Sequence, residues 1–159
     1  MPPRFTEVPD MSAWSQSIGG LVINFGIAEF LTLRCVQVHS GEPAAFAIRK
    51  KKLSERIAAA KDSVLKSKRT AEQKKRVSEL WSEISALSKV RNQVAHNPLI
   101  LGFHPATQRA VFSVVNLQKM TPTGDNALEP LDHAEIAATA LRIGEITREL
   151  REIIESPIP

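Results

Sequence analysis

The positions of the prolines constrain the fold of this chain more than any other feature. Ten prolines stand at positions 2, 3, 9, 43, 98, 105, 122, 130, 157 and 159 of the 159 residues. They leave three long stretches without proline, and each stretch carries apolar residues at the helical spacing of three and four. The chain is therefore predicted to be mainly helical.

The length and composition indicate one soluble domain. Hydrophobic residues make up 43% of the chain and charged residues 24%, as in globular proteins with a single core, so we predict one domain over residues 1–159. The first residues lack the order of a secretory signal, and the apolar stretch from Ile18 to Leu33 is shorter than the roughly 20 residues of a membrane span. We expect a cytoplasmic protein that does not enter a membrane.

The first proline-free stretch predicts a helix from Met11 to about Val38 that is apolar on two opposite sides. A helix of this kind is either central in a bundle or covered by a second subunit, so a homodimer is expected. The main stripe consists of Trp14, Ile18, Leu21, Phe25, Ala28 and Thr32, flanked by Val22 and Val36, and the other side carries Ile23, Ile27 and Phe30.

The remaining stretches predict further helices and one hairpin. Thr70 and Gln73 form the pattern of a capping box, and Pro98 disfavours helix at the residue before it. The expected elements are a short helix near 44–51, helices at 53–66 and from 70 to about 96, β-prone runs at 99–103 and 110–115, and a last helix capped by Asp132 with Glu135. The predicted fold class is all-α: a four- to five-helix bundle with a small β-hairpin inserted before the last helix.

Positive charge is concentrated between Arg49 and Arg76. This segment holds twelve of the 21 basic residues and only three of the 17 acidic ones, a local net charge of +9 against −5 for the rest of the chain. Such asymmetry can mark a binding surface for a phosphate-rich ligand. A pair of solvated lysine-rich helices is the alternative explanation.

Cysteine and histidine usage argues against metal chemistry. Cys35 is the single cysteine, and the four histidines are dispersed without the spacing of a zinc site, so we expect no metal and no cofactor. We predict that Cys35, Trp14 and Trp81 are core residues. The other three histidines are expected to be ordinary exposed residues outside any site: His39, His104 and His133.

The first candidate site residue is Arg91. Helical projection places Arg91 on the apolar face of its helix, where a buried guanidinium costs several kcal/mol unless an anion pairs with it. Glu29 lies on the apolar stripe of the first helix and is the internal candidate for that anion. A structural ion pair between Arg91 and Glu29 is thus the alternative to a functional site.

His96 is the second candidate. It follows Arg91 by five residues, in the last turn of the helix, where the helix dipole favours a protonated imidazole. Residues five apart are separated by about 140° around a helix, so the two side chains of one chain are not expected to share a face. Two copies of this helix end facing each other in a dimer would bring both pairs into one cleft.

The segment Arg91-Asn-Gln-Val-Ala-His96, with Leu87 before it and Asn97-Pro98 after it, resembles the R-x4-6-H motif of the HEPN superfamily. The order of an apolar helix, a basic helix, the motif helix, an interruption and a closing helix is similar as well. The resemblance implies a dimeric, metal-independent endoribonuclease, a class common among toxins and antiviral defence proteins, with some inactive relatives. It implies Arg91 and His96 as the catalytic pair and Asn92 as a polar residue that orients substrate or histidine. Glu29 is added from this chain's own pattern as a supporting residue that orients Arg91.

Those side chains suit RNA cleavage without a metal or cofactor. The 2′-hydroxyl of RNA can attack the adjacent phosphorus and leave a 2′,3′-cyclic phosphate and a 5′-hydroxyl. His96 would transfer protons, and Arg91 would bind the phosphate oxygens as charge develops on them. The expected partners are RNA, a second copy of the chain and, as the resemblance permits, a separately encoded antitoxin.

The sequence is also compatible with two other functions. The first is a catalytically silent HEPN-like dimer that binds a partner protein or a nucleotide, which a blocked cleft or an Arg91 neutralised by Glu29 of its own subunit would indicate. The second is a helical protein that binds RNA or DNA without cutting it, which would depend on the basic residues Lys50 to Lys52.

Overall fold

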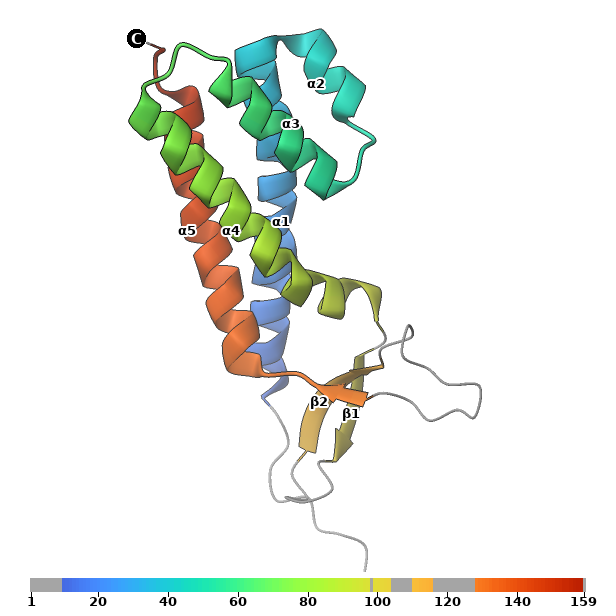
Figure 1. Ribbon diagram of the computed structural model, residues 1–159. Coiled ribbons are helices and arrows are strands. Elements are labelled where there is room, and N and C mark those ends of the chain that lie inside the picture. The colour runs from blue at the N-terminus through green and yellow to red at the C-terminus, as the bar shows by residue number, and fades with distance from the viewer. Residues whose placement is uncertain (1–9, 98, 104–109, 116–127, 159) are drawn as a thin grey trace, which may run out of the picture. The chain divides into compact units, whose positions relative to one another are not determined.

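The computed structural model describes residues 10–97, 99–103, 110–115 and 128–158 (Figure 1). Within these residues the fold is an all-α bundle with a small sheet inserted before the last helix. The helices are α1 (Met11–Ser40), α2 (Glu42–Ile48), α3 (Leu53–Leu65), α4 (Ala71–His96) and α5 (His133–Glu155). The strands are β1 (Leu99–Phe103), β2 (Ala110–Val115) and β3 (Leu128–Pro130).

The helix boundaries follow from local signals in the sequence. The predicted capping box is present: the Gln73 amide donates to Thr70 Oγ1 at 3.2 Å, and the Thr70 amide donates to Gln73 Oε1 at 3.3 Å. Asp132 caps α5, because its Oδ1 accepts from the Ala134 amide at 2.8 Å. Gly41 separates α1 from α2 with a φ of 89°, a conformation that favours glycine.

The chain divides into two compact units. One comprises Met1–Val22 with Lys89–Ala140, and the other comprises Ile23–Ser88 with Leu141–Pro159. The division runs through the long helices α1, α4 and α5.

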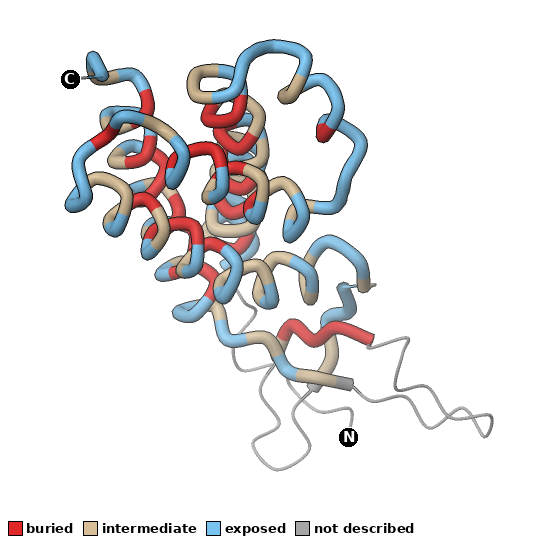
Figure 2. The backbone as a smooth tube through the Cα atoms, turned by 45° about the horizontal axis from the view of Figure 1, so that its top comes forward, coloured by how far each residue is buried: buried red, intermediate tan, exposed pale blue. Residues whose placement is uncertain are grey.

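The second unit is built from helices alone. Side-chain contacts join α1 to α3 (Glu29 with Arg56), α3 to α4 (Lys61 with Ser82), and α4 to α5 (Arg76 with Glu149). Figure 2 shows buried and exposed residues alternating along these helices. The core of this unit includes Phe25, Leu31, Cys35, Ile57, Val64, Val77, Leu80, Trp81, Ile84, Ile143, Ile146, Leu150 and Ile154.

The first unit contains the sheet. The strands pair in the order β1-β2-β3, all antiparallel, with Leu99 opposite Val114 and Ser113 opposite Pro130. The predicted hairpin is therefore extended by a third strand. The three-residue strand β3 has no alternating apolar pattern of its own, and the backbone of β2 provides its pairing. The turn predicted at 104–109, with His104, lies outside the described residues.

Trp14 anchors the core of this first unit. Its ring centroid lies 4.6 Å from that of Phe112 on β2 and 4.9 Å from that of His133 at the start of α5. His133 Nε2 also lies 3.0 Å from Ser17 Oγ. The prediction of Trp14 as a core residue is confirmed, whereas His133 is half-buried and partnered rather than an ordinary exposed histidine.

α1 buries one side and exposes the other. Leu21, Phe25 and Leu31 are no more than 1% exposed, whereas Ile23 and Phe30 on the opposite side are 64% and 59% exposed. Among the described helices, α1 alone is long and apolar enough to cross a membrane, a property that the core helix of a soluble protein shares. The predicted two-sided apolar character is thus present, with the outer side uncovered in the single chain.

Candidate functional site

The predicted motif lies at the carboxyl end of α4. Arg91, Asn92 and His96 occupy the last two turns of the helix, which ends at His96. The next residue closes the helix, because Asn97 Nδ2 donates to the Gln93 carbonyl oxygen at 3.0 Å. The helix end predicted near residue 96 is therefore confirmed, while Pro98 lies outside the described residues.

Arg91 and His96 of one chain converge. Arg91 Nη1 lies 3.4 Å from His96 Nε2 and donates to Asn92 Oδ1 at 3.0 Å. The expectation that these two side chains do not share a face is wrong. The long arginine side chain spans the angular separation, and His96 is the terminal residue of the helix. A single chain thus brings all three motif residues together.

The exposure of Arg91 also differs from the prediction. Arg91 is half-buried, and Asn92 and His96 are exposed. The apolar stripe of α4 is buried at Val77, Leu80, Trp81 and Ile84, but positions from Leu87 onward are only partly covered. A guanidinium with access to water avoids most of the cost of burial, so Arg91 does not require an internal carboxylate.

Glu29 pairs with Arg56. Glu29 Oε2 accepts from Arg56 Nη2 at 2.8 Å, and the two side chains are 31% and 13% exposed. Sequence reasoning did not identify Arg56 as a partner, because twelve basic residues crowd the segment that contains it. Glu29 belongs to the helical unit and Arg91 to the unit that contains the sheet. The predicted orientation of Arg91 by Glu29 therefore stays a prediction.

Within the described part of the chain, the buried cation is Arg69. It is 3% exposed and donates to neutral acceptors: Ile154 O at 2.7 Å, Ser156 Oγ at 2.9 Å and O at 3.2 Å, and His39 Nε2 at 3.2 Å. Nothing in the sequence distinguishes Arg69 from the basic residues around it. It fastens the connection between α3 and α4 to the carboxyl end of α5, where a helix dipole favours a cation. Its role is structural.

Two other titratable groups have shifted pKa values. Burial raises the pKa of the Cys35 thiol to about 11, so the predicted core role of this residue is confirmed and a thiolate nucleophile is disfavoured. Burial, followed by the nearby charge of Arg69, lowers the pKa of His39, which is half-buried rather than exposed as predicted.

Two arginine–glutamate ion pairs join α4 to α5 in the second unit. Arg76 donates to both carboxylate oxygens of Glu149 at 2.5 and 2.7 Å, and Arg142 donates to both of Glu83 at 2.6 and 2.9 Å. These hydrogen bonds lower the pKa of Glu83 and Glu149. Arg76 belongs to the basic segment, so part of that segment's charge is used inside the fold.

The site has the elements of acid–base and phosphate chemistry. His96 supplies an exposed imidazole, and Arg91 supplies a planar fork of donors that matches a phosphate. In the described part of the chain, no three histidine, cysteine, aspartate or glutamate side chains gather as metal ligands. Comparison with family models, curated proteins and solved structures finds no match for the chain.

Proposed function

We propose that this protein is a metal-independent endoribonuclease. The observation that carries the proposal is the approach of Arg91 Nη1 to within 3.4 Å of His96 Nε2 at an accessible helix end. The resemblance of the segment from Arg91 to His96 to the HEPN motif supports the same function. The proposed class is a cytoplasmic toxin or defence ribonuclease, with RNA as its substrate and a separately encoded antitoxin as its regulator.

In the proposed reaction the 2′-oxygen attacks the adjacent phosphorus, and the bond from phosphorus to the 5′-oxygen breaks. His96 takes the proton from the 2′-hydroxyl or delivers one to the leaving 5′-oxygen. Arg91 binds the non-bridging oxygens and stabilises the charge that develops on them. Asn92 holds the guanidinium through its Oδ1 at 3.0 Å and so sets the orientation of the fork. The products are a 2′,3′-cyclic phosphate and a 5′-hydroxyl.

A homodimer belongs to the proposal. The outer side of α1 exposes Ile23 and Phe30 by more than half of their surface, and covering such side chains with a second copy removes apolar area from water. Because one chain already brings Arg91 and His96 together, each chain of a dimer would contribute a complete pair. The composite site would then hold two such pairs.

One observation favours the second candidate function, a silent dimer that binds a partner protein or a nucleotide. Arg91 Nη1 lies 3.4 Å from His96 Nε2 within its own chain, so the imidazole must turn away from the guanidinium before its Nε2 can exchange a proton with RNA. A binding module does not need that rearrangement. The two candidate functions share a fold, and they differ in whether bound RNA is cut.

The test is cleavage of end-labelled RNA in EDTA by the wild type, Arg91→Ala and His96→Ala. Lys89→Ala is the matched control, since it removes an exposed cation from the same part of α4. We expect cyclic-phosphate products from the wild type and the control, and a loss of about a hundredfold or more in each motif variant. Circular dichroism checks that every variant is folded.

Two results would contradict the proposal. Undiminished cleavage by the folded His96→Ala protein would show that the activity belongs to a contaminant or to another site. A wild type that is inert on diverse single-stranded and structured RNAs would favour the silent dimer.

A further inference from the structure

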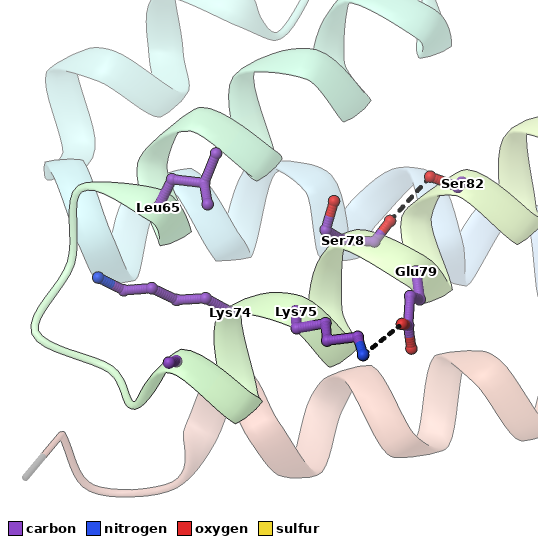
Figure 3. Close-up of a pocket in the computed structure, with 7 residues that line it drawn as sticks. Leu65, Lys74, Lys75, Ser78, Glu79 and Ser82 are labelled. Atoms are coloured by element: carbon purple, nitrogen blue, oxygen red, sulfur yellow. Dashed lines mark hydrogen bonds and ion pairs between the residues drawn. The ribbon is translucent and has the colours of Figure 1, made fainter.

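A groove of about 680 Å³ lies between α3 and α4 in the helical unit (Figure 3). Leu65 lines it from α3, and Lys74, Lys75, Ser78 and Ser82 line it from α4. Lys74, Ser78 and Ser82 are four residues apart and Lys75 precedes Ser78 by three, which places all four along one side of the helix. The groove therefore has a continuous polar wall and an apolar edge.

Positive charge dominates the groove. Lys74 and Lys75 line one end, and Lys61 reaches the other end, where its Nζ donates to Ser82 Oγ at 2.6 Å. Glu79 is the one carboxylate among the lining residues, and it is shared between Lys75 at 4.0 Å and Arg76 at 3.7 Å. No ion pair of Lys74 occurs within the described residues. The groove thus has cations in excess of its carboxylates.

Several other cations of the basic segment are already engaged within the fold. Arg56 is paired with Glu29, Lys66 with Asp62, Arg76 with Glu149, and Arg69 is buried against the end of α5. Arg49 lies over the ring of Phe46, with its Cζ 3.3 Å from the centroid. Lys74 is therefore among the charges that the fold leaves available for a ligand, and the contact of Lys75 with Glu79 is long, at 4.0 Å.

We propose that the groove between α3 and α4 binds the sugar-phosphate backbone of the RNA substrate. This inference rests on the proposed function for its choice of polyanion. Lys74 and Lys75 contact successive phosphates, and the Ser78 hydroxyl bonds a ribose or phosphate oxygen. Leu65, which is 57% exposed, packs against the apolar side of a ribose. All of these contacts are to phosphates and riboses rather than to base edges, so the groove binds RNA with little regard to sequence.

The experiment measures equilibrium binding of a fluorescent single-stranded RNA over a range of salt concentrations. The His96→Ala protein serves as the background, because it keeps the groove and should leave the RNA intact. Lys74→Gln with Lys75→Gln is added to it as the groove variant. Lys50→Gln with Lys51→Gln is the matched control, since both lysines are exposed members of the same basic segment outside the groove.

We expect the groove variant to lose about tenfold in affinity at low salt and the control to lose much less. The slope of log affinity against log salt should fall by about 1.4 in the groove variant, the value for two phosphate contacts to a single strand. Equal losses in the two variants would overturn the inference, because binding would then depend on total charge rather than on this groove. Affinity unchanged in the groove variant, or no binding of RNA at all, would overturn it as well.

A competition arm tests the nature of the ligand. Unlabelled RNA and polyglutamate are compared as competitors at equal total charge. If polyglutamate displaces the labelled RNA equally well, the ligand of the groove is an acidic polypeptide and the assignment to RNA is wrong.

The results distinguish a failure of the groove proposal from a failure of the proposed function. An RNA that binds through the groove but is never cut contradicts only the ribonuclease, and an RNA that is cut equally well with both lysines replaced contradicts only the groove.

Discussion

At the scale of single residues, the pair of Arg69 and His39 shows how a buried cation is held without a carboxylate. Arg69 Nε donates to His39 Nε2, so the imidazole in this pair is neutral and carries its proton on Nδ1. The remaining guanidinium donors bond the last turn of α5 and Ser156. Protonation of His39 would turn the acceptor into a donor and place two cations side by side.

We predict that folding stability falls as the pH is lowered through the range where His39 titrates. Burial and the charge of Arg69 lower the pKa of His39 in the folded state, so the unfolded chain binds a proton at a higher pH than the folded chain does. The contribution of His39 is complete above about pH 6.5 and is lost as the pH falls below that value. Urea denaturation at about pH 7.5 and about pH 5.5 measures the change.

His39→Gln is the informative variant for this prediction, since an amide oxygen can still accept from Arg69 and does not titrate. Its urea midpoint should depend less on pH than that of the wild type. Ser40→Ala, which changes an exposed residue next to His39 that does not titrate, is the control and should keep the wild-type dependence. A wild-type midpoint that stays constant between the two pH values would show that His39 does not couple protonation to folding.

At the scale of elements, α1 and α5 approach closely at Gly144. A Cβ atom at this position would lie 3.0 Å from Asn24 Nδ2 of α1, which is tighter than an ordinary contact. Asn24 interrupts the apolar sequence of α1 next to the place where α5 lacks a side chain. A glycine inside a helix costs helical propensity, and here it allows two helices to pack.

We predict that Gly144→Val destabilises the protein by about 1–3 kcal/mol more than Gly26→Val does. The two substitutions change helical propensity alike, but a Cβ at Gly26 meets no atom within 4 Å. The difference in the free energy of unfolding, measured with urea, therefore isolates the contact with Asn24. Equal losses at the two positions would show that the Asn24 side chain moves aside at no cost.

At the scale of the whole molecule, we predict a dimer of twice the 17.5 kDa chain mass by light scattering. Phe30→Glu should raise the dissociation constant by at least about tenfold, because it places a charge on the exposed outer side of α1. Phe46→Glu is the control on α2, since Phe46 is similarly exposed at 62%. A wild type that stays monomeric at high concentration, or equal weakening by both variants, would contradict an interface on α1.

The sequence by itself determined most of the secondary structure. The strands predicted at 99–103 and 110–115 have those bounds in the structure, and the helices differ from their predicted bounds by a few residues. The predicted stripe of the last helix is buried at every position: Ile136, Ala140, Ile143, Thr147, Leu150 and Ile154. Apolar periodicity, caps and prolines act over one or two turns, so they can be read without knowledge of the fold.

Only the tertiary structure decided which charges are paired, buried or available. Arg69 rather than Arg91 is the buried arginine, Glu29 is bonded to Arg56, and Lys74 lines a groove without a described ion pair. Arg91 comes within 3.4 Å of His96 because α4 ends at His96 and because the long arginine side chain reaches that end. These pairings join positions up to 87 residues apart, and their energies depend on distance and burial. A linear sequence contains the charges, but the folded chain sets the distances between them.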